Sequence, residues 1–135
     1  MRRRDVLLDT GPLVAVLDPR DQWHARCAAE WPALIDRCVT SEAVLTEATH
    51  LVLRGGGRAG AAIEFVVRAG IPVVPLDGQA LRRVLRLMER YEDLPMDYAD
   101  ASLVALAEAL HISTVFTLDR RGGFSTYALA RGVMF

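Results

Sequence analysis

Short apolar runs alternate with longer segments of helical length along the chain. Five runs have the length of a strand buried in a sheet, and they cover residues 5–9, 38–41, 71–76, 113–119 and 132–135. Six intervening segments have helical length or apolar spacing, over residues 12–17, 18–31, 42–53, 58–70, 78–94 and 97–110. Because parallel strands are usually joined by helices, this alternation predicts an α/β fold. We expect a parallel sheet of four to five strands, flanked by helices on both faces.

The pattern also predicts where some elements begin and which side they bury. Ser41 stands directly before the helix over 42–53, as a capping residue does. The two prolines within 71–76 suit an edge strand, because proline has no N–H to donate. The amphipathic helix over 78–94 has a predicted apolar side formed by Leu81, Val84, Leu85 and Met88. The Ala-rich helix over 97–110 is strongly apolar and is expected at the centre.

Composition narrows the class of protein. The 135 residues are 52% hydrophobic with a formal net charge of −1, so we expect one globular domain over 1–135 without global attraction to nucleic acid. All 16 basic residues are arginine, which excludes Schiff-base and P-loop lysines and argues against a receiver-type signalling domain. Cys27 and Cys38 suit a reduced core. No apolar run suits a membrane span or a signal segment, so a cytoplasmic protein is expected.

Two aspartates follow predicted strands. Asp9 ends the run "DVLLD", and Asp119 ends the run "STVFTLD". Parallel α/β sheets bind ligands outside the carboxyl ends of their strands, and an ionised aspartate is rarely buried without a partner. A helix cap or an Asx turn explains either residue alone. Two such acids at one edge favour a binding site.

Three further acids lie on predicted helices. Glu47 falls along the apolar stripe of its helix, where a carboxylate is costly unless a residue such as Arg54 pairs with it. Asp97 and Asp100 are three residues apart at the start of the predicted helix over 97–110, which is the spacing of a capping box. Capping explains Asp97 well, but Asp100 adds a charge to a strongly apolar helix.

Acids converging from four elements predict a bound cation. Converging carboxylates raise one another's pKa unless a cation keeps them ionised. A ligand set of oxygens alone favours Mg²⁺ or Mn²⁺ over zinc, and such a site suits phosphodiester hydrolysis by an activated water. Thr10 and Thr117 stand close in sequence to Asp9 and Asp119, so they can hydrogen-bond the carboxylates or a phosphate, although both also fit turns or strands without a function.

Four segments, in chain order, resemble the PIN domain family and in particular its VapC-like toxins. They are "LLDTGPLVAVLD", "TSEAVLTEATHLV", "LPMDYADASLVALAEAL" and "VFTLDRRGGFSTY", and together they span nearly the whole chain. The resemblance implies a parallel sheet flanked by helices and a Mg²⁺- or Mn²⁺-dependent endoribonuclease. It also implies a protein that commonly forms a homodimer and is silenced by a cognate antitoxin.

The resemblance gives single residues a role. The family's catalytic acids match, in chain order, Asp9, Glu47, Asp100 and Asp119. Thr10 matches the threonine or serine that follows the first acid and is a candidate for substrate binding together with Thr117. The implied metal ligands are Asp9, Asp100 and Asp119. Asp97 occupies a position that varies among such proteins, so it is either an auxiliary ligand or a helix cap.

Arginines near these acids are candidates for contacting RNA. Arg120 and Arg121 directly follow Asp119, where they either bind phosphate or remain solvated. A second group repeats at three- and four-residue spacing along the helix over 78–94 and consists of Arg82, Arg83, Arg86 and Arg90. The simpler interpretation of this second group is a solvated face, or ion pairs with Glu89 and Glu92.

Two other functions fit the same residues. One is a PIN nuclease of RNA processing that has no antitoxin. The other is a non-catalytic RNA- or protein-binding module in which the acids cap helices or receive arginines. The segments "LTEATHLVL" and "AAIEFVV" carry more apolar residues than one buried stripe needs, which favours a homodimer under any of these functions.

Overall fold

The structure is a computed structural model that describes residues 3–94, 96–118 and 131–133. The strands are β1 (Val6–Leu8), β2 (Cys38–Ser41), β3 (Val73–Val74), β4 (Thr114–Phe116) and β5 (Arg131–Val133). The helices are α1 (Thr10–Leu17), α2 (His24–Leu34), α3 (Glu42–Arg54), α4 (Ala61–Ala69), α5 (Gly78–Arg90) and α6 (Tyr98–Leu110), with a 3₁₀ turn at Ile35–Arg37.

The strands form a five-stranded sheet in the order β3-β2-β1-β4-β5, and every neighbouring pair is parallel. The predicted parallel α/β fold is therefore confirmed. Strand β3 lies at one edge, as its two flanking prolines predict, and it is only two residues long. Strand β1 is central, so the residue that follows it reaches the middle of the carboxyl edge of the sheet.

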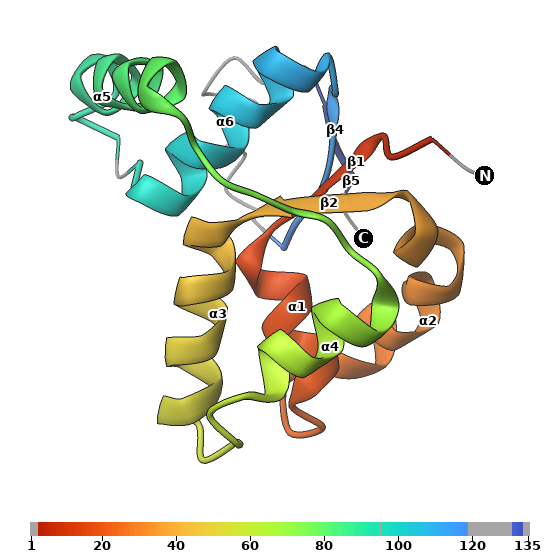
Figure 1. Ribbon diagram of the computed structural model, residues 1–135. Helices are drawn as coiled ribbons and strands as arrows, with labels where there is room; N and C mark the ends of the chain where they lie inside the picture. The colour runs from red at the N-terminus through yellow and green to blue at the C-terminus, as the bar shows by residue number, and fades with distance from the viewer. Residues whose placement is uncertain (1–2, 95, 119–130, 134–135) are drawn as a thin grey trace.

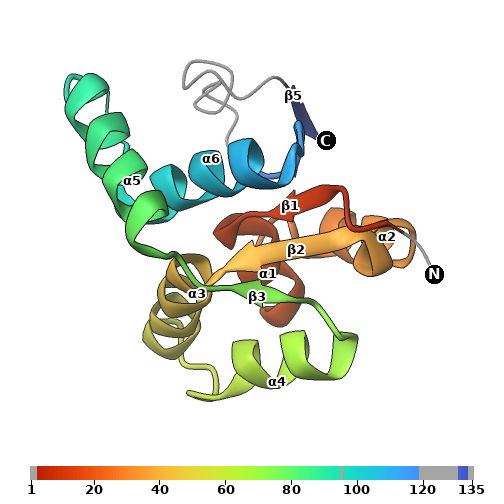
Figure 2. The same ribbon diagram turned by 45° about the horizontal axis from the view of Figure 1, so that its top comes forward.

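Helices cover both faces of the sheet (Figures 1 and 2). Leu7, Val39 and Val115 point to the face covered by α5 and α6 and join a core cluster with these helices. Leu8 and Phe116, one residue along in their strands, join the opposite cluster with α1, α2, α3 and α4. This alternation follows from the two-residue period of a strand, and it buries β1 completely because both faces are covered.

The predicted helix over 18–31 begins only at His24, which corrects the sequence-based boundary. Two aspartates divert the backbone before that point. Asp18 accepts a hydrogen bond from the backbone N–H of Arg20 at 2.9 Å, and Asp21 accepts one from the N–H of Trp23 at 2.8 Å. Such local side-chain bonds compete with helical ones, so a turn separates α1 from α2.

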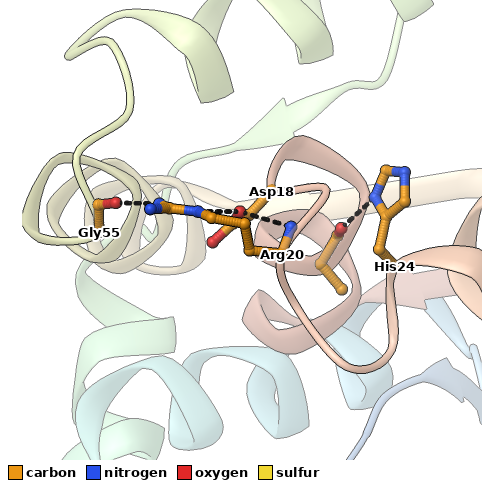
Figure 3. A network of polar contacts seen from close by, with 5 residues as sticks. Asp18, Arg20, His24 and Gly55 are labelled. Atoms are coloured by element: carbon orange, nitrogen blue, oxygen red, sulfur yellow. Dashed lines mark hydrogen bonds and ion pairs between the residues drawn. The ribbon is translucent and has the colours of Figure 1, made fainter.

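Side-chain hydrogen bonds hold this turn against α1 and α3 (Figure 3). The Arg20 guanidinium contacts the Asp18 carboxylate and donates to the carbonyl oxygen of Gly55, the residue that caps the C-terminal end of α3. His24 donates from Nδ1 to the carbonyl oxygen of Ala15 at 2.8 Å. The turn therefore connects the ends of α1 and α3.

The buried side of α5 also differs from the prediction. Val84 and Leu87 are buried against α6, and Met88 is half-buried, but Leu81 and Leu85 are 45% and 59% exposed. The helix packs mainly on α6. A single neighbouring helix covers only a narrow stripe of α5, so not all four predicted apolar positions are buried. None of the helices within the described ranges is long and apolar enough to cross a membrane.

Candidate metal centre

Asp9 lies immediately after the central strand β1 and caps α1. Its backbone N–H donates to the carbonyl oxygen of Phe116 at 3.0 Å, which continues the pairing of β1 with β4. One carboxylate oxygen, Oδ1, accepts from the N–H of Thr10 at 2.8 Å, and Oδ2 accepts from the hydroxyl of Thr117 at 2.7 Å. Because a donor holds each oxygen, the plane of this carboxylate is fixed at the edge of the sheet. Thr117 thus hydrogen-bonds the Asp9 carboxylate, which is one of the two roles predicted for it.

Thr10 follows Asp9 in the first turn of α1. Its hydroxyl is buried and makes no hydrogen bond of normal geometry within the described part of the chain. The hydroxyl nevertheless lies near enough to the Glu47 carboxyl to lower its pKa. A buried hydroxyl with unused hydrogen-bonding capacity is costly in a packed core, and it is typical of a site that is completed by a ligand.

The first turn of α1 also closely approaches the segment that follows β4. A Cβ atom at Gly11 would lie 3.3 Å from the Cβ atom of Leu118, so glycine permits the contact. Leu118 is the last described residue before Asp119. The chain leaving β4 is therefore packed against the same turn that carries Asp9 and Thr10.

Glu47 lies half-buried in the middle of α3. No ion pair joins it to Arg54 anywhere in the described ranges, so the alternative in which Arg54 pairs with Glu47 does not hold there. Burial raises the pKa of Glu47 above its usual value, and the neighbouring charges of Asp97 and Asp9 raise it further. Glu47 therefore faces the acids that follow β1 and begin α6.

The start of α6 is a reciprocal capping box. The Asp97 side chain accepts from the backbone N–H of Asp100 at 2.8 Å, and the Asp100 side chain accepts from the N–H of Asp97 at 3.3 Å. The predicted capping arrangement is thus present, but capping alone does not account for the environment of Asp100. Burial, followed by the charges of Asp97 and Asp9, raises the pKa of Asp100 to about 7.

Four carboxylates from β1, α3 and α6 therefore influence one another, and they are Asp9, Glu47, Asp97 and Asp100. Within residues 3–94, 96–118 and 131–133, no three acids, histidines or cysteines are arranged to hold a metal ion by themselves. The predicted fourth acid, Asp119, lies outside the described residues, as do Arg120 and Arg121. The oxygen donors fit Mg²⁺ or Mn²⁺, because the acids supply carboxylates and the buried Thr10 hydroxyl beside them makes no hydrogen bond of normal geometry to any described residue.

Three buried hydroxyls that support this edge were not singled out from the sequence as part of the site. Thr40 donates a hydrogen bond of 2.8 Å to the carbonyl oxygen of Leu8, the residue directly before Asp9. Ser41, predicted only as a helix cap, also contacts Ser102 of α6 at 2.7 Å. The signal in the sequence was a hydroxyl inside a strongly apolar segment, as Ser102 is in "ADASLVALA".

The arginines of α5 only partly follow the prediction. Arg83 pairs with Glu108 of α6 through two hydrogen bonds of 2.7 Å, and not with Glu89 or Glu92. Arg82, Arg86 and Arg90 are exposed and make no ion pair within the described ranges. Most of this basic side therefore remains a solvated face.

A parallel α/β sheet with acids gathered at its carboxyl edge defines the class of this protein, and comparison with known proteins names its family. The model of the PIN domain matches residues 6–129. This chain belongs to the PIN domain family, as its sequence motifs indicate. It is 30% identical over 118 residues to ribonuclease VapC26 of Mycobacterium tuberculosis (strain ATCC 25618 / H37Rv), a match that covers 86% of this chain and 87% of that protein.

A solved structure shows the same fold. The crystal structure of VapC20 of Mycobacterium tuberculosis, a toxin that cleaves the sarcin–ricin loop, superposes with a TM-score of 0.80. The match covers 92% of this chain and 95% of VapC20, at 21% sequence identity. At this identity the likeness concerns the fold, and it agrees with the sheet and helices described above.

Proposed function

We propose that this protein is a Mg²⁺- or Mn²⁺-dependent endoribonuclease that hydrolyses RNA phosphodiester bonds as the toxin of a type II toxin–antitoxin pair. The observation that carries the proposal is the group of acids at the carboxyl edge. Asp100 and Glu47 have raised pKa values because they are buried beside other carboxylates, and a divalent cation would remove this penalty. Similarity to a VapC ribonuclease over most of the chain supports the same activity.

In this proposal the ligands of the cation are Asp9, Asp100 and Asp119, with Asp97 as an auxiliary ligand. A bound Mg²⁺ or Mn²⁺ supplies an activated water and neutralises charge on the leaving oxygen. Thr117 and the Thr10 N–H hold the Asp9 carboxylate in one orientation, so it needs no rearrangement to act as a ligand.

The remaining residues handle the proton and the substrate. Burial and the neighbouring charges of Asp97 and Asp9 raise the pKa of Glu47, which suits a group that accepts and returns a proton. The buried Thr10 hydroxyl supplies a hydrogen bond to a phosphate oxygen, and Thr117 stabilises the same edge. Arg120 and Arg121 contact the RNA backbone, because arginine binds phosphate through two parallel hydrogen bonds.

We also propose a homodimer, a cognate antitoxin as partner, and a cytoplasmic location. Exposed apolar side chains on α3 and α4 support an interface, since Leu53 is 54% exposed, Ile63 47% and Val67 72%. Multi-angle light scattering of the purified protein tests the dimer. A short neighbouring reading frame that encodes a small DNA-binding protein would support the antitoxin, whereas its absence would favour a PIN nuclease of RNA processing.

The proposed nuclease is tested by cleavage of a labelled RNA pool with the purified protein in Mn²⁺, in EDTA, and with the variant Asp9→Asn. Asparagine keeps the helix cap but removes the charge, so we expect the fold to persist and cleavage to be lost. Asp77→Asn, at the exposed cap of α5, is the matched control and should cleave normally. Full activity of Asp9→Asn, once contaminating nuclease is excluded, would contradict the proposal, and failure of the wild type to bind Mn²⁺ or cleave would favour a binding-only module.

A further inference from the structure

Two serines on different elements meet in the core beside the acids. Ser41 ends β2 and caps α3, and Ser102 lies in the second turn of α6. Both residues are fully buried, and their hydroxyl oxygens are 2.7 Å apart. They are 61 positions apart in the sequence, so the contact joins two separate parts of the chain.

The direction of these hydrogen bonds follows from the neighbouring groups. The Ser102 hydroxyl donates to the carbonyl oxygen of Ala99 at 2.7 Å, and a carbonyl can only accept. The proton between the serines must therefore come from Ser41. Ser41 in turn accepts from the backbone N–H of Val44 at 3.1 Å. The chain runs from Val44 N–H through Ser41 and Ser102 to Ala99, and each serine hydroxyl donates once and accepts at least once.

This chain of bonds, which we call the serine link, joins the first turn of α3 to the first turn of α6. Glu47 follows Val44 by less than one helical turn, and Ala99 lies between Asp97 and Asp100 in the capping box. Across the two helices the carboxylates of Glu47 and Asp97 repel each other, because the charge of Asp97 raises the pKa of Glu47. Like charges push the helices apart, whereas a buried, fully satisfied hydrogen-bonded link resists displacement.

We propose that Ser102, acting through Ser41, is a positioning residue that sets the spacing between Glu47 on α3 and the two acids that begin α6. This role rests on the proposed metal-dependent nuclease, and it adds a residue that touches neither metal nor substrate. In Ser102→Ala the Ser41 hydroxyl loses its acceptor and α6 loses its bond to α3. The spacing of the acids then relaxes, and a cation binds less tightly.

The first test is Mn²⁺ affinity, measured by calorimetry on the intact protein. We expect Ser102→Ala to weaken Mn²⁺ binding by roughly tenfold, the lower end of what loss of an outer-shell partner costs. Val52→Ala is the matched control, because it removes buried contacts from the far end of α3 without touching the serine link. It should bind Mn²⁺ as the wild type does. Ser102→Cys keeps a weak donor of similar size and should recover part of the affinity, and it replaces Ser102→Ala if alanine prevents folding.

The second test separates positioning from catalysis. Cleavage rates are measured under single-turnover conditions at increasing Mn²⁺ for the wild type, Ser102→Ala and Asp9→Asn. Ser102→Ala should approach the wild-type rate at saturating Mn²⁺, because its acids are intact, whereas Asp9→Asn should not. Wild-type Mn²⁺ affinity in Ser102→Ala, or a loss equal to that of Val52→Ala, overturns the role of the link.

A third measurement keeps the link testable if the proposed function fails. Should the wild type neither bind Mn²⁺ nor cleave RNA, the ¹³C resonance of the Glu47 carboxyl is recorded in metal-free protein. Glu47 lies on the other helix, so a shift in Ser102→Ala that exceeds the shift in Val52→Ala supports the positioning role. An unchanged Glu47 resonance overturns it.

Discussion

Helices α5 and α6 begin in nearly the same way, yet only one of these starts belongs to the candidate site. Asp77 caps α5 with φ −80° and ψ −179°, and Asp97 caps α6 with φ −86° and ψ 178°. Each side chain accepts the backbone N–H of the residue three positions later at 2.8 Å. That later residue is Ala80 in α5 and Asp100 in α6.

The two starts differ in what the rest of the fold brings near them. Asp77 is exposed, and its carboxylate serves the helix end in solvent. The start of α6 is partly buried near Asp9, which follows β1, and burial, followed by the charges of Asp97 and Asp9, raises the pKa of Asp100 to about 7. The charge of Asp97 also raises the pKa of Glu47 on α3. The presence of a capping motif therefore does not by itself indicate a functional site. Neighbours from other elements decide whether its acids only stabilise a helix or also form a site.

The largest expected effect comes from making α6 begin like α5. Asp100→Ala reproduces the Asp–Ala arrangement of Asp77 and Ala80, and it removes a proposed metal ligand. We expect RNA cleavage to fall by at least about 100-fold, since even the loss of a ligand's outer-shell partner costs up to that much. Initial rates on a labelled RNA in Mn²⁺ measure the effect.

The matched change at α5 is Asp77→Ala, which should leave the cleavage rate within about twofold of wild type because that cap lies outside the proposed site. A comparable loss of activity in both variants would mean that helix stability, and not the acid at position 100, limits cleavage.

The second effect concerns stability, and here removing the charge of Asp100 is expected to be favourable. The folded pKa of Asp100, about 7, lies above its ordinary value of 3.8, so between these values the folded state binds more protons than the unfolded state. Stability from this group is therefore present at low pH and is lost as pH rises towards 7. Asp100→Asn keeps an acceptor for the Asp97 N–H but cannot ionise. In EDTA at pH 8 it should be more stable than wild type by about 2 kcal/mol, a figure halved to allow for solvent screening.

Urea unfolding of the wild type and of Asp100→Asn at pH 4 and pH 8 tests whether the charge of Asp100 lowers the free energy of unfolding. At pH 4 wild type and Asp100→Asn should differ little, because Asp100 is protonated in the folded state. Equal stability of the two proteins at pH 8 would show that Asp100 is not held beside other charges, and the comparison between α5 and α6 would lose its basis.

The same comparison shows what the sequence could predict. Short buried runs such as Val6–Leu8 specify strands, and the alternation with helices specifies a parallel sheet, because local length and period determine both. Asp9 could be placed at the carboxyl edge for the same reason. The motifs of the PIN family also match nearly the full chain, so the sequence alone was enough to recognise the family.

Other features depend on contacts that no local pattern contains. The late start of α2 depends on side-chain bonds of Asp18 and Asp21 that replace helical ones. The exposure of Leu81 and Leu85 depends on how little of α5 its neighbour covers. The link between Ser41 and Ser102 joins residues 61 positions apart, and a buried serine on an apolar helix gives no indication of its partner.

The smallest effect distinguishes the two caps themselves. Asp77→Ala should lower the free energy of unfolding by about 1 kcal/mol, the usual cost of losing an aspartate cap. Asp97→Ala loses an equivalent hydrogen bond but also removes a charge that raises the pKa of Asp100 and Glu47. At pH 8 in EDTA it should therefore cost less than Asp77→Ala. At pH 4 Asp100 is neutral in the folded state and Glu47 is largely so, which leaves little repulsion to relieve, and the two costs should approach each other. Chemical unfolding of both variants at both pH values measures this difference. If Asp97→Ala costs as much as Asp77→Ala at pH 8, Asp97 acts as a cap alone, and the cation would have to be held without it.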